Sequence, residues 1–212
     1  MNKLNFQALT DREIEKLNGR KATLLLHACC APCSSASLEY LTKYFDITLF
    51  FYNPNISSAK EFGKRLDELK RFTEECPFAK GIKIISPEYN HEEFLSAAAG
   101  LENAKEGGER CEKCFRLRLN KTAEQAEKSG FEYFATTLTI SPLKNAEKIN
   151  LCGEDAAVVG NVLYLSTDLK KRERYKQRFR EDRCSSFRFH DRTIRFHRIV
   201  IRQYRSGQFF FW

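Results

Sequence analysis

The chain has 212 residues, of which 42% are hydrophobic and 30% are charged, a balance typical of a globular protein with one buried core. Residues 1–20 are polar and include acids throughout, so we expect a polar N-terminal extension rather than a signal peptide. No apolar run approaches the roughly 20 residues that a membrane-spanning helix needs. We therefore expect a cytoplasmic protein with no membrane partner.

The net charge of +8 is concentrated near the end of the chain. Residues 1–171 contain 24 Lys and Arg and 24 Asp and Glu, whereas residues 172–212 contain 12 basic and 4 acidic residues. Eleven of those 12 bases are Arg, although Lys predominates upstream. The final segment therefore follows a different composition from the rest of the chain.

Short apolar segments alternate with longer amphipathic ones. Residues 59–75, for example, carry Phe62, Leu66, Leu69 and Phe72 at helical spacing. The pattern predicts strands at 22–26, 47–52, 82–85, 131–136 and 162–165, and helices at 34–43, 59–75, 92–99, 112–129 and from 145 onward. This alternation predicts an α/β fold: an open, mostly parallel, Rossmann-like sheet with helices on both faces. Ligands bind such sheets beyond the carboxyl ends of the strands, where the strand order reverses.

Five of the eight cysteines form two tight groups. Cys29, Cys30 and Cys33 directly follow the first predicted strand, and Cys111 and Cys114 stand where a predicted helix begins. Because the cytoplasm keeps thiols reduced, a disulfide framework is not expected. A two-residue gap lets one turn present two thiolates to the same metal or cluster edge. The groups therefore favour a redox metal site over buried structural thiols, although the spacing alone does not separate zinc from an iron–sulfur cluster.

The second cysteine group has a basic setting. The helix N-terminus at Cys111 and Cys114 favours thiolate over thiol, as do Arg110, Arg116 and Arg118 nearby, although such charges also occur on solvated helix faces. The remaining cysteines, Cys76, Cys152 and Cys184, are solitary and are interpreted as structural or incidental.

Motifs in the order of the chain resemble the epoxyqueuosine reductase QueH family. The first is Leu-Leu-His-Ala-Cys-Cys-Ala-Pro-Cys at 25–33, and the others are Tyr52–Ile56, Pro87–Asn90, Glu106–Leu119 and Ala135–Lys144. The resemblance implies an oxidoreductase that removes the epoxide oxygen of epoxyqueuosine at the wobble position of tRNA, giving queuosine in the last step of queuosine biosynthesis. A tRNA substrate and an unidentified electron donor are the implied partners. Basic side chains within 64–71 and 110–118 are candidate phosphate contacts.

The resemblance also implies the site residues. It places a [4Fe-4S] cluster on Cys29, Cys30, Cys111 and Cys114, with Cys33 beside it as a ligand of a second iron or as a participant in electron transfer. Asp168, in Thr-Asp-Leu-Lys-Lys at 167–171, is a further catalytic candidate, and its alternative role is that of a helix N-cap.

The resemblance stops near residue 177, so we expect an α/β iron–sulfur catalytic domain at 21–177 and an atypical Arg- and Phe-rich tail at 178–212. The family continues with Tyr-Cys-Gly-Cys, whose cysteines form a redox-active disulfide, but no Cys-x-Cys occurs in this chain. Our hypothesis is a frameshift near 172–178, which would leave the reductase impaired or inactive. The alternative is a basic, aromatic tail that binds RNA.

Two other functions compete with this interpretation. ATP-dependent tRNA-thiolation enzymes share the strand–loop–helix layout, but they need a Gly-rich phosphate loop, and residues 27–33 contain no glycine. A non-catalytic, zinc-stabilised RNA-binding protein is the second alternative.

Overall fold

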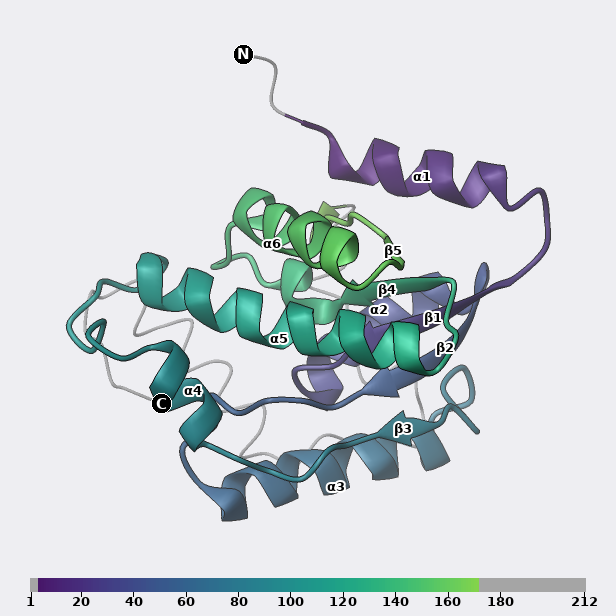
Figure 1. Cartoon of the computed structure of the whole chain (residues 1–212). Helices are drawn as coiled ribbons and strands as arrows, with labels where there is room; N and C mark the ends of the chain where they lie inside the picture. Colours follow the sequence, from purple (N-terminus) through teal and green to yellow (C-terminus); the bar gives the residue numbers. More distant parts are fainter. Residues whose placement is uncertain (1–3, 172–212) are drawn as a thin grey trace.

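The structure is a computed structural model that describes residues 4–171, so the predicted tail at 178–212 lies outside the described residues. In chain order (Figure 1), the elements are α1 (Phe6–Lys16), β1 (Ala22–His27), α2 (Ala31–Leu41), β2 (Phe45–Phe50), α3 (Ala59–Glu75), β3 (Ile84–Ile85), α4 (Glu92–Ala97), α5 (Glu109–Lys128), β4 (Tyr133–Thr136), the 3₁₀ turn η1 (Thr137–Ile140), α6 (Ala146–Val159) and β5 (Leu163–Tyr164).

The strands form one parallel sheet in the order β3-β2-β1-β4-β5. The chain adds β2 and β3 on one side of β1 and then returns to add β4 and β5 on the other. The strand order therefore reverses between β1 and β4, where His27 pairs with Thr136. The predicted open, parallel α/β fold is confirmed, and the segments after β1 and β4 both begin at the switch point of the sheet.

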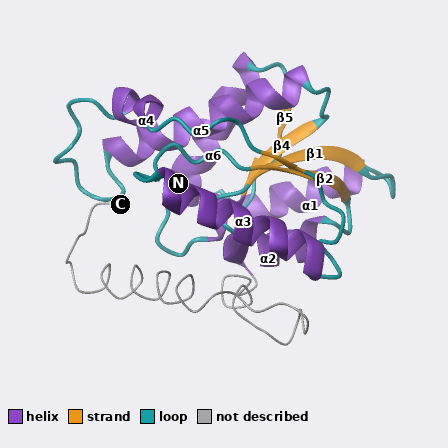
Figure 2. Ribbon diagram, turned by 90° about the horizontal axis from the view of Figure 1, so that it is seen from below, coloured by secondary structure: helices purple, strands orange, loops and turns teal. Residues whose placement is uncertain are grey.

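Helices cover both faces of the sheet because β1 is apolar on both faces. Leu24 and Leu26 belong to the core cluster under α2 and α3, whereas Leu25 belongs to the cluster under α5 and α6. This alternation follows from the two-residue period of a strand. Figure 2 shows α2 and α3 on one side of the sheet and α5 and α6 on the other. None of the helices within residues 4–171 has the length and apolar character that crossing a bilayer requires.

Residues 6–16, which the sequence suggested only as part of a polar extension, form helix α1. Asn5 caps this helix by accepting from the Ala8 N–H. Thr10 Oγ1 lies 2.8 Å from the Ser166 carbonyl oxygen, and Gln7 donates to Tyr40 on α2. These long-range contacts stabilise a helix whose own sequence has too few apolar residues to predict it.

Candidate metal centre

The first cysteine group lies at the carboxyl end of β1. The sequence predicted a helix at 34–43, but α2 begins at Ala31, with Cys30 at the N-cap and Pro32 in the first turn. Proline suits that position because its missing N–H has no helical partner there. Cys33 therefore lies on the first turn of a helix rather than in a loop, which turns its side chain back toward Cys29 and Cys30.

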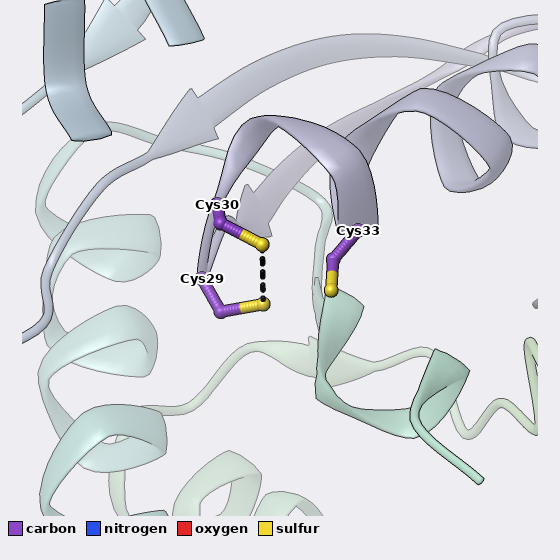
Figure 3. Close-up of side chains that lie close together, drawn as sticks. All are labelled: Cys29, Cys30 and Cys33. Atoms are coloured by element: carbon purple, nitrogen blue, oxygen red, sulfur yellow. Dashed lines mark hydrogen bonds between the residues drawn. The ribbon is translucent and has the colours of Figure 1, made fainter. Parts of the chain in front are cut away.

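The three sulfurs face one another (Figure 3). The Sγ atoms of Cys29 and Cys30 are 3.7 Å apart, and the Sγ atoms of Cys29, Cys30 and Cys33 all lie within 4.8 Å of one another. Among residues 4–171 this is the one group of three or more His, Cys, Asp or Glu side chains close enough to hold a metal ion. Three soft sulfur donors at this separation fit zinc or iron–sulfur ligation.

The thiols of this group differ in the direction in which their surroundings shift the pKa. Hydrogen bonds from Cys30 and Cys33, the positive charge of Arg118 and the Thr137 hydroxyl hold the pKa of Cys29 well below its usual range. The pKa values of Cys30 and Cys33 are raised, chiefly because both hydrogen-bond to Cys29 and are themselves buried. Cys29 is therefore the most acidic thiol of the group, and the thiolate is the form that binds metals.

Thr137, at the start of η1, holds Cys29 from the neighbouring strand. Its Oγ1 accepts from the Cys29 N–H at 3.1 Å and donates to the Cys29 Sγ at 3.4 Å. Thr137 was not among the predicted site residues. Its position could have indicated it, because Thr137 comes after β4 as Cys29 comes after β1, and both strands end at the switch point.

A buried polar network lies beneath the cysteine turn. His27 Nε2 lies 3.2 Å from Arg118 Nε and 3.1 Å from the Tyr52 carbonyl oxygen, and His27 Nδ1 shares a hydrogen bond of 2.8 Å with Thr136 Oγ1. Arg118 Nη2 donates to Asn53 Oδ1, and Asn53 Nδ2 donates to the Ala28 carbonyl oxygen. Burial and the charge of Arg118 lower the pKa of His27 to about 3, so the imidazole is neutral.

The second cysteine group lies in the first turns of α5, which begins at Glu109. Cys111 and Cys114 are half-buried, and Cys111 Sγ accepts from the Gly107 N–H at 3.2 Å. Burial raises the pKa of Cys111, so the expected helix-terminus effect is not the dominant one. Cys111 packs against the same apolar cluster as Cys29, but neither Cys111 nor Cys114 is within the close group of three sulfurs. The four-cysteine ligand set stays a prediction.

Asp168 lies in a segment that is hydrogen-bonded to α6. Asn150 donates to the Thr167 carbonyl oxygen and accepts from the Thr167 N–H, and Thr139 shares a hydrogen bond with the Thr167 hydroxyl. Asp168 itself is 8% exposed, and its Oδ1 is buried without a hydrogen bond. Lys170 Nζ forms an ion pair with that oxygen at 3.6 Å. The two roles expected of Asp168, catalytic residue and helix N-cap, both stay predictions.

The basic candidates for tRNA contact differ in their surroundings. On α3, Arg65, Lys70 and Arg71 pair with acids of the same helix, as on a solvated helix face. Arg116 pairs with Glu112 and Asp155 at the surface. Arg118 is 4% exposed, so it does not reach a phosphate.

An open α/β domain with three thiols converging at its switch point belongs to the class of proteins that could bind a metal ion through cysteine sulfurs. Comparison with known proteins narrows that class. Residues 24–188 match the family model described as epoxyqueuosine reductase QueH. The chain therefore belongs to the epoxyqueuosine reductase QueH family.

Individual relatives agree with the family match. The chain is 42% identical over 159 residues to the epoxyqueuosine reductase QueH of Streptococcus pyogenes serotype M1, an alignment covering 74% of this chain and 62% of that protein. It is 38% identical over 181 residues to the protein of that name from Staphylococcus epidermidis, covering 82% and 76%. The Thermotoga maritima protein is 33% identical over 161 residues, covering 73% and 79%. The chain thus spans less than two thirds of the length of the streptococcal relative.

Proposed function

We propose that the chain is an epoxyqueuosine reductase, which removes the epoxide oxygen of epoxyqueuosine at the wobble position of tRNA to give queuosine. The observation that carries this proposal is the group of three thiols at the switch point, within 4.8 Å of one another, in a member of this family. Reduced thiols and a tRNA substrate both fit the cytoplasm.

The reaction breaks two carbon–oxygen bonds, leaves a carbon–carbon double bond and releases the oxygen as water, consuming two electrons and two protons. An iron–sulfur cofactor, when bound, supplies the electrons and a Lewis acid for the oxygen. An external electron donor replenishes the electrons. The chain binds and orients the nucleoside at the carboxyl edge of the sheet and excludes water from it.

The proposed ligands of a [4Fe-4S] cluster are Cys29, Cys30, Cys111 and Cys114. Cys114 and Cys111 precede Arg118 by four and seven residues, so all three side chains lie on one face of α5. Arg118 contacts His27 directly below the cysteine turn. Because a helix rises about 1.5 Å per residue, that face carries Cys114 about 6 Å beyond Arg118, in the direction of the N-terminus of α5.

Cys33 and Asp168 are proposed to act beside the cluster, at a second iron or in electron transfer. The Sγ of Cys33 belongs to the close thiol group, and the buried Oδ1 of Asp168 has no hydrogen-bond partner. A thiol and a carboxylate are both suitable ligands for iron, and a buried carboxylate oxygen that lacks a hydrogen bond is costly.

Anaerobic reconstitution with iron and sulfide tests the proposal. We expect a brown protein whose visible absorbance bleaches on reduction. Nucleoside mass spectrometry then measures whether this chain converts epoxyqueuosine in tRNA to queuosine or is impaired by its C-terminal segment. Cys29→Ser and Cys114→Ser should abolish the colour, whereas Cys152→Ala, at a solitary buried cysteine of α6, should keep it.

Three outcomes would contradict parts of the proposal. Stoichiometric zinc without colour would support the zinc-stabilised RNA-binding alternative. An unchanged spectrum in both serine variants would refute the ligand set. A coloured protein that leaves epoxyqueuosine unconverted would support the hypothesis that the C-terminal segment is frameshifted and the chain inactive.

A further inference from the structure

Arg118 is a buried cation that has no acidic partner in the described part of the chain. Its side chain emerges from the middle of α5, and the residue is 4% exposed. Within residues 4–171, no Asp or Glu forms an ion pair with it, whereas Arg116, one half-turn earlier on the same helix, pairs with two carboxylates at the surface. A buried guanidinium normally requires a compensating anion.

The hydrogen-bond partners of Arg118 are neutral. Its Nε–H donates to the uncharged imidazole of His27, and its Nη2 donates to the amide oxygen of Asn53. These bonds fix the guanidinium plane and satisfy two of its donors, but they do not neutralise its charge. Removing a charge from water costs several kcal/mol when no opposite charge is near.

The contacts of Arg118 converge on the cysteine turn. His27 is two residues before Cys29, and Asn53 carries the connection from Arg118 to the carbonyl of Ala28, the residue directly before Cys29. Arg118 is therefore linked through His27 and Asn53 to the turn that carries Cys29, Cys30 and Cys33, the three thiols that could hold a metal ion.

We propose that Arg118 is the built-in counter-charge of the cysteine-held cofactor, a positioning residue that stabilises the anionic thiolates and favours the reduced state of the cofactor. The inference rests on the proposed function for the identity of that cofactor. The reduction potential of an iron–sulfur centre depends on the local charge, and a fixed positive charge nearby makes the addition of an electron more favourable.

The first test compares Arg118→Gln with Arg116→Gln after anaerobic reconstitution, with the midpoint potential measured by spectroelectrochemical titration. Both variants remove one positive charge from α5, but only Arg118→Gln removes it from beside the cysteine turn. We expect Arg118→Gln to decrease the reduced-to-oxidised ratio at a fixed applied potential by about tenfold or more, about 59 mV for a one-electron couple. Arg116→Gln should leave the potential unchanged.

A second pair of variants separates charge from structure. Asn53→Asp puts a carboxylate in place of the amide oxygen that accepts from Arg118, so it neutralises the guanidinium without removing it. Asn53→Ala loses both the hydrogen bond from Arg118 and the one to the Ala28 carbonyl oxygen, and it adds no charge. We expect the potential to fall in Asn53→Asp and to stay near the wild-type value in Asn53→Ala. This pair also replaces Arg118→Gln if that variant does not fold, as judged by circular dichroism.

The outcomes distinguish this inference from the proposed function. Wild-type potentials in folded, iron-loaded Arg118→Gln and Asn53→Asp overturn the inference and leave the reductase proposal intact. Equal shifts in Asn53→Asp and Asn53→Ala also overturn it, because the effect would then be structural. A wild-type chain that takes up only zinc overturns both.

Discussion

Replacing Thr137 with Val tests how β4 holds the cysteine turn. The two side chains have nearly the same shape, so the variant removes a hydroxyl without opening a cavity. The Cys29 N–H loses its acceptor at 3.1 Å, and the Cys29 sulfur loses a donor at 3.4 Å. Leaving one buried polar group without a partner costs about 1–3 kcal/mol.

This cost should appear in the metal-free protein. For a chain of this length, each kcal/mol lowers the melting temperature by roughly 2–4 °C, so we expect Thr137→Val to melt roughly 2–12 °C below the wild type. Differential scanning calorimetry gives both the melting temperature and the enthalpy. Thr137→Ser, which keeps the hydroxyl, is the matched control. If Val and Ser variants melted at the same temperature, the hydroxyl would not be supporting Cys29.

Three further predictions concern pH, packing and the gene. Because the pKa of His27 is lowered from 6.5 to about 3, the unfolded chain binds a proton that the folded chain does not. The contribution of His27 to the free energy of unfolding should therefore be fully present above pH 6.5 and should fall by roughly 1.4 kcal/mol per pH unit toward pH 3. Chemical denaturation at several pH values measures this slope, which should be absent in His27→Asn. Gly63→Ala, in open space on α3, should stabilise by about 0.5–1 kcal/mol in urea, whereas Gly153→Ala on α6 should destabilise because its Cβ would collide with the Tyr164 ring. The other two reading frames of the gene downstream of codon 172 should encode Tyr-Cys-Gly-Cys, and their lacking it would refute the frameshift hypothesis.

The elements that the sequence predicted well carry their signal locally. Helix α3 has the predicted bounds, since its apolar residues recur at helical spacing and Ser58 caps it by accepting from the Glu61 N–H. The strand predicted at 47–52 instead ends at Phe50, the last residue that pairs with β1. The prediction extended too far because Phe51 and Tyr52 continue the apolar run beyond the strand. Helix α1 was missed because contacts from Ser166 and Tyr40, distant in sequence, hold it in place.

Some features of the candidate site were likewise predictable from local sequence, and others depend on the tertiary structure. Cys29, Cys30 and Cys33 lie on one turn, so their convergence follows from five consecutive residues and was predictable. Their relation to Thr137 depends on which strand is added next to β1, and no local pattern encodes that choice. The buried Oδ1 of Asp168, which has no hydrogen bond, likewise depends on tertiary structure, because hydrogen bonds from α6 and η1 fix the neighbouring Thr167.

By itself, the sequence determined the α/β fold class, the two cysteine groups and the family, because each depends on residue type and short-range spacing. Arg116 and Arg118, by contrast, are indistinguishable as sequence: two arginines on one helix near two cysteines. Only the tertiary structure puts the first on the surface beside Asp155 and the second beneath the cysteine turn beside His27. The physical reason is that two residues along a helix turn a side chain by about 200°, and only the packing of α5 on the sheet decides which side is buried.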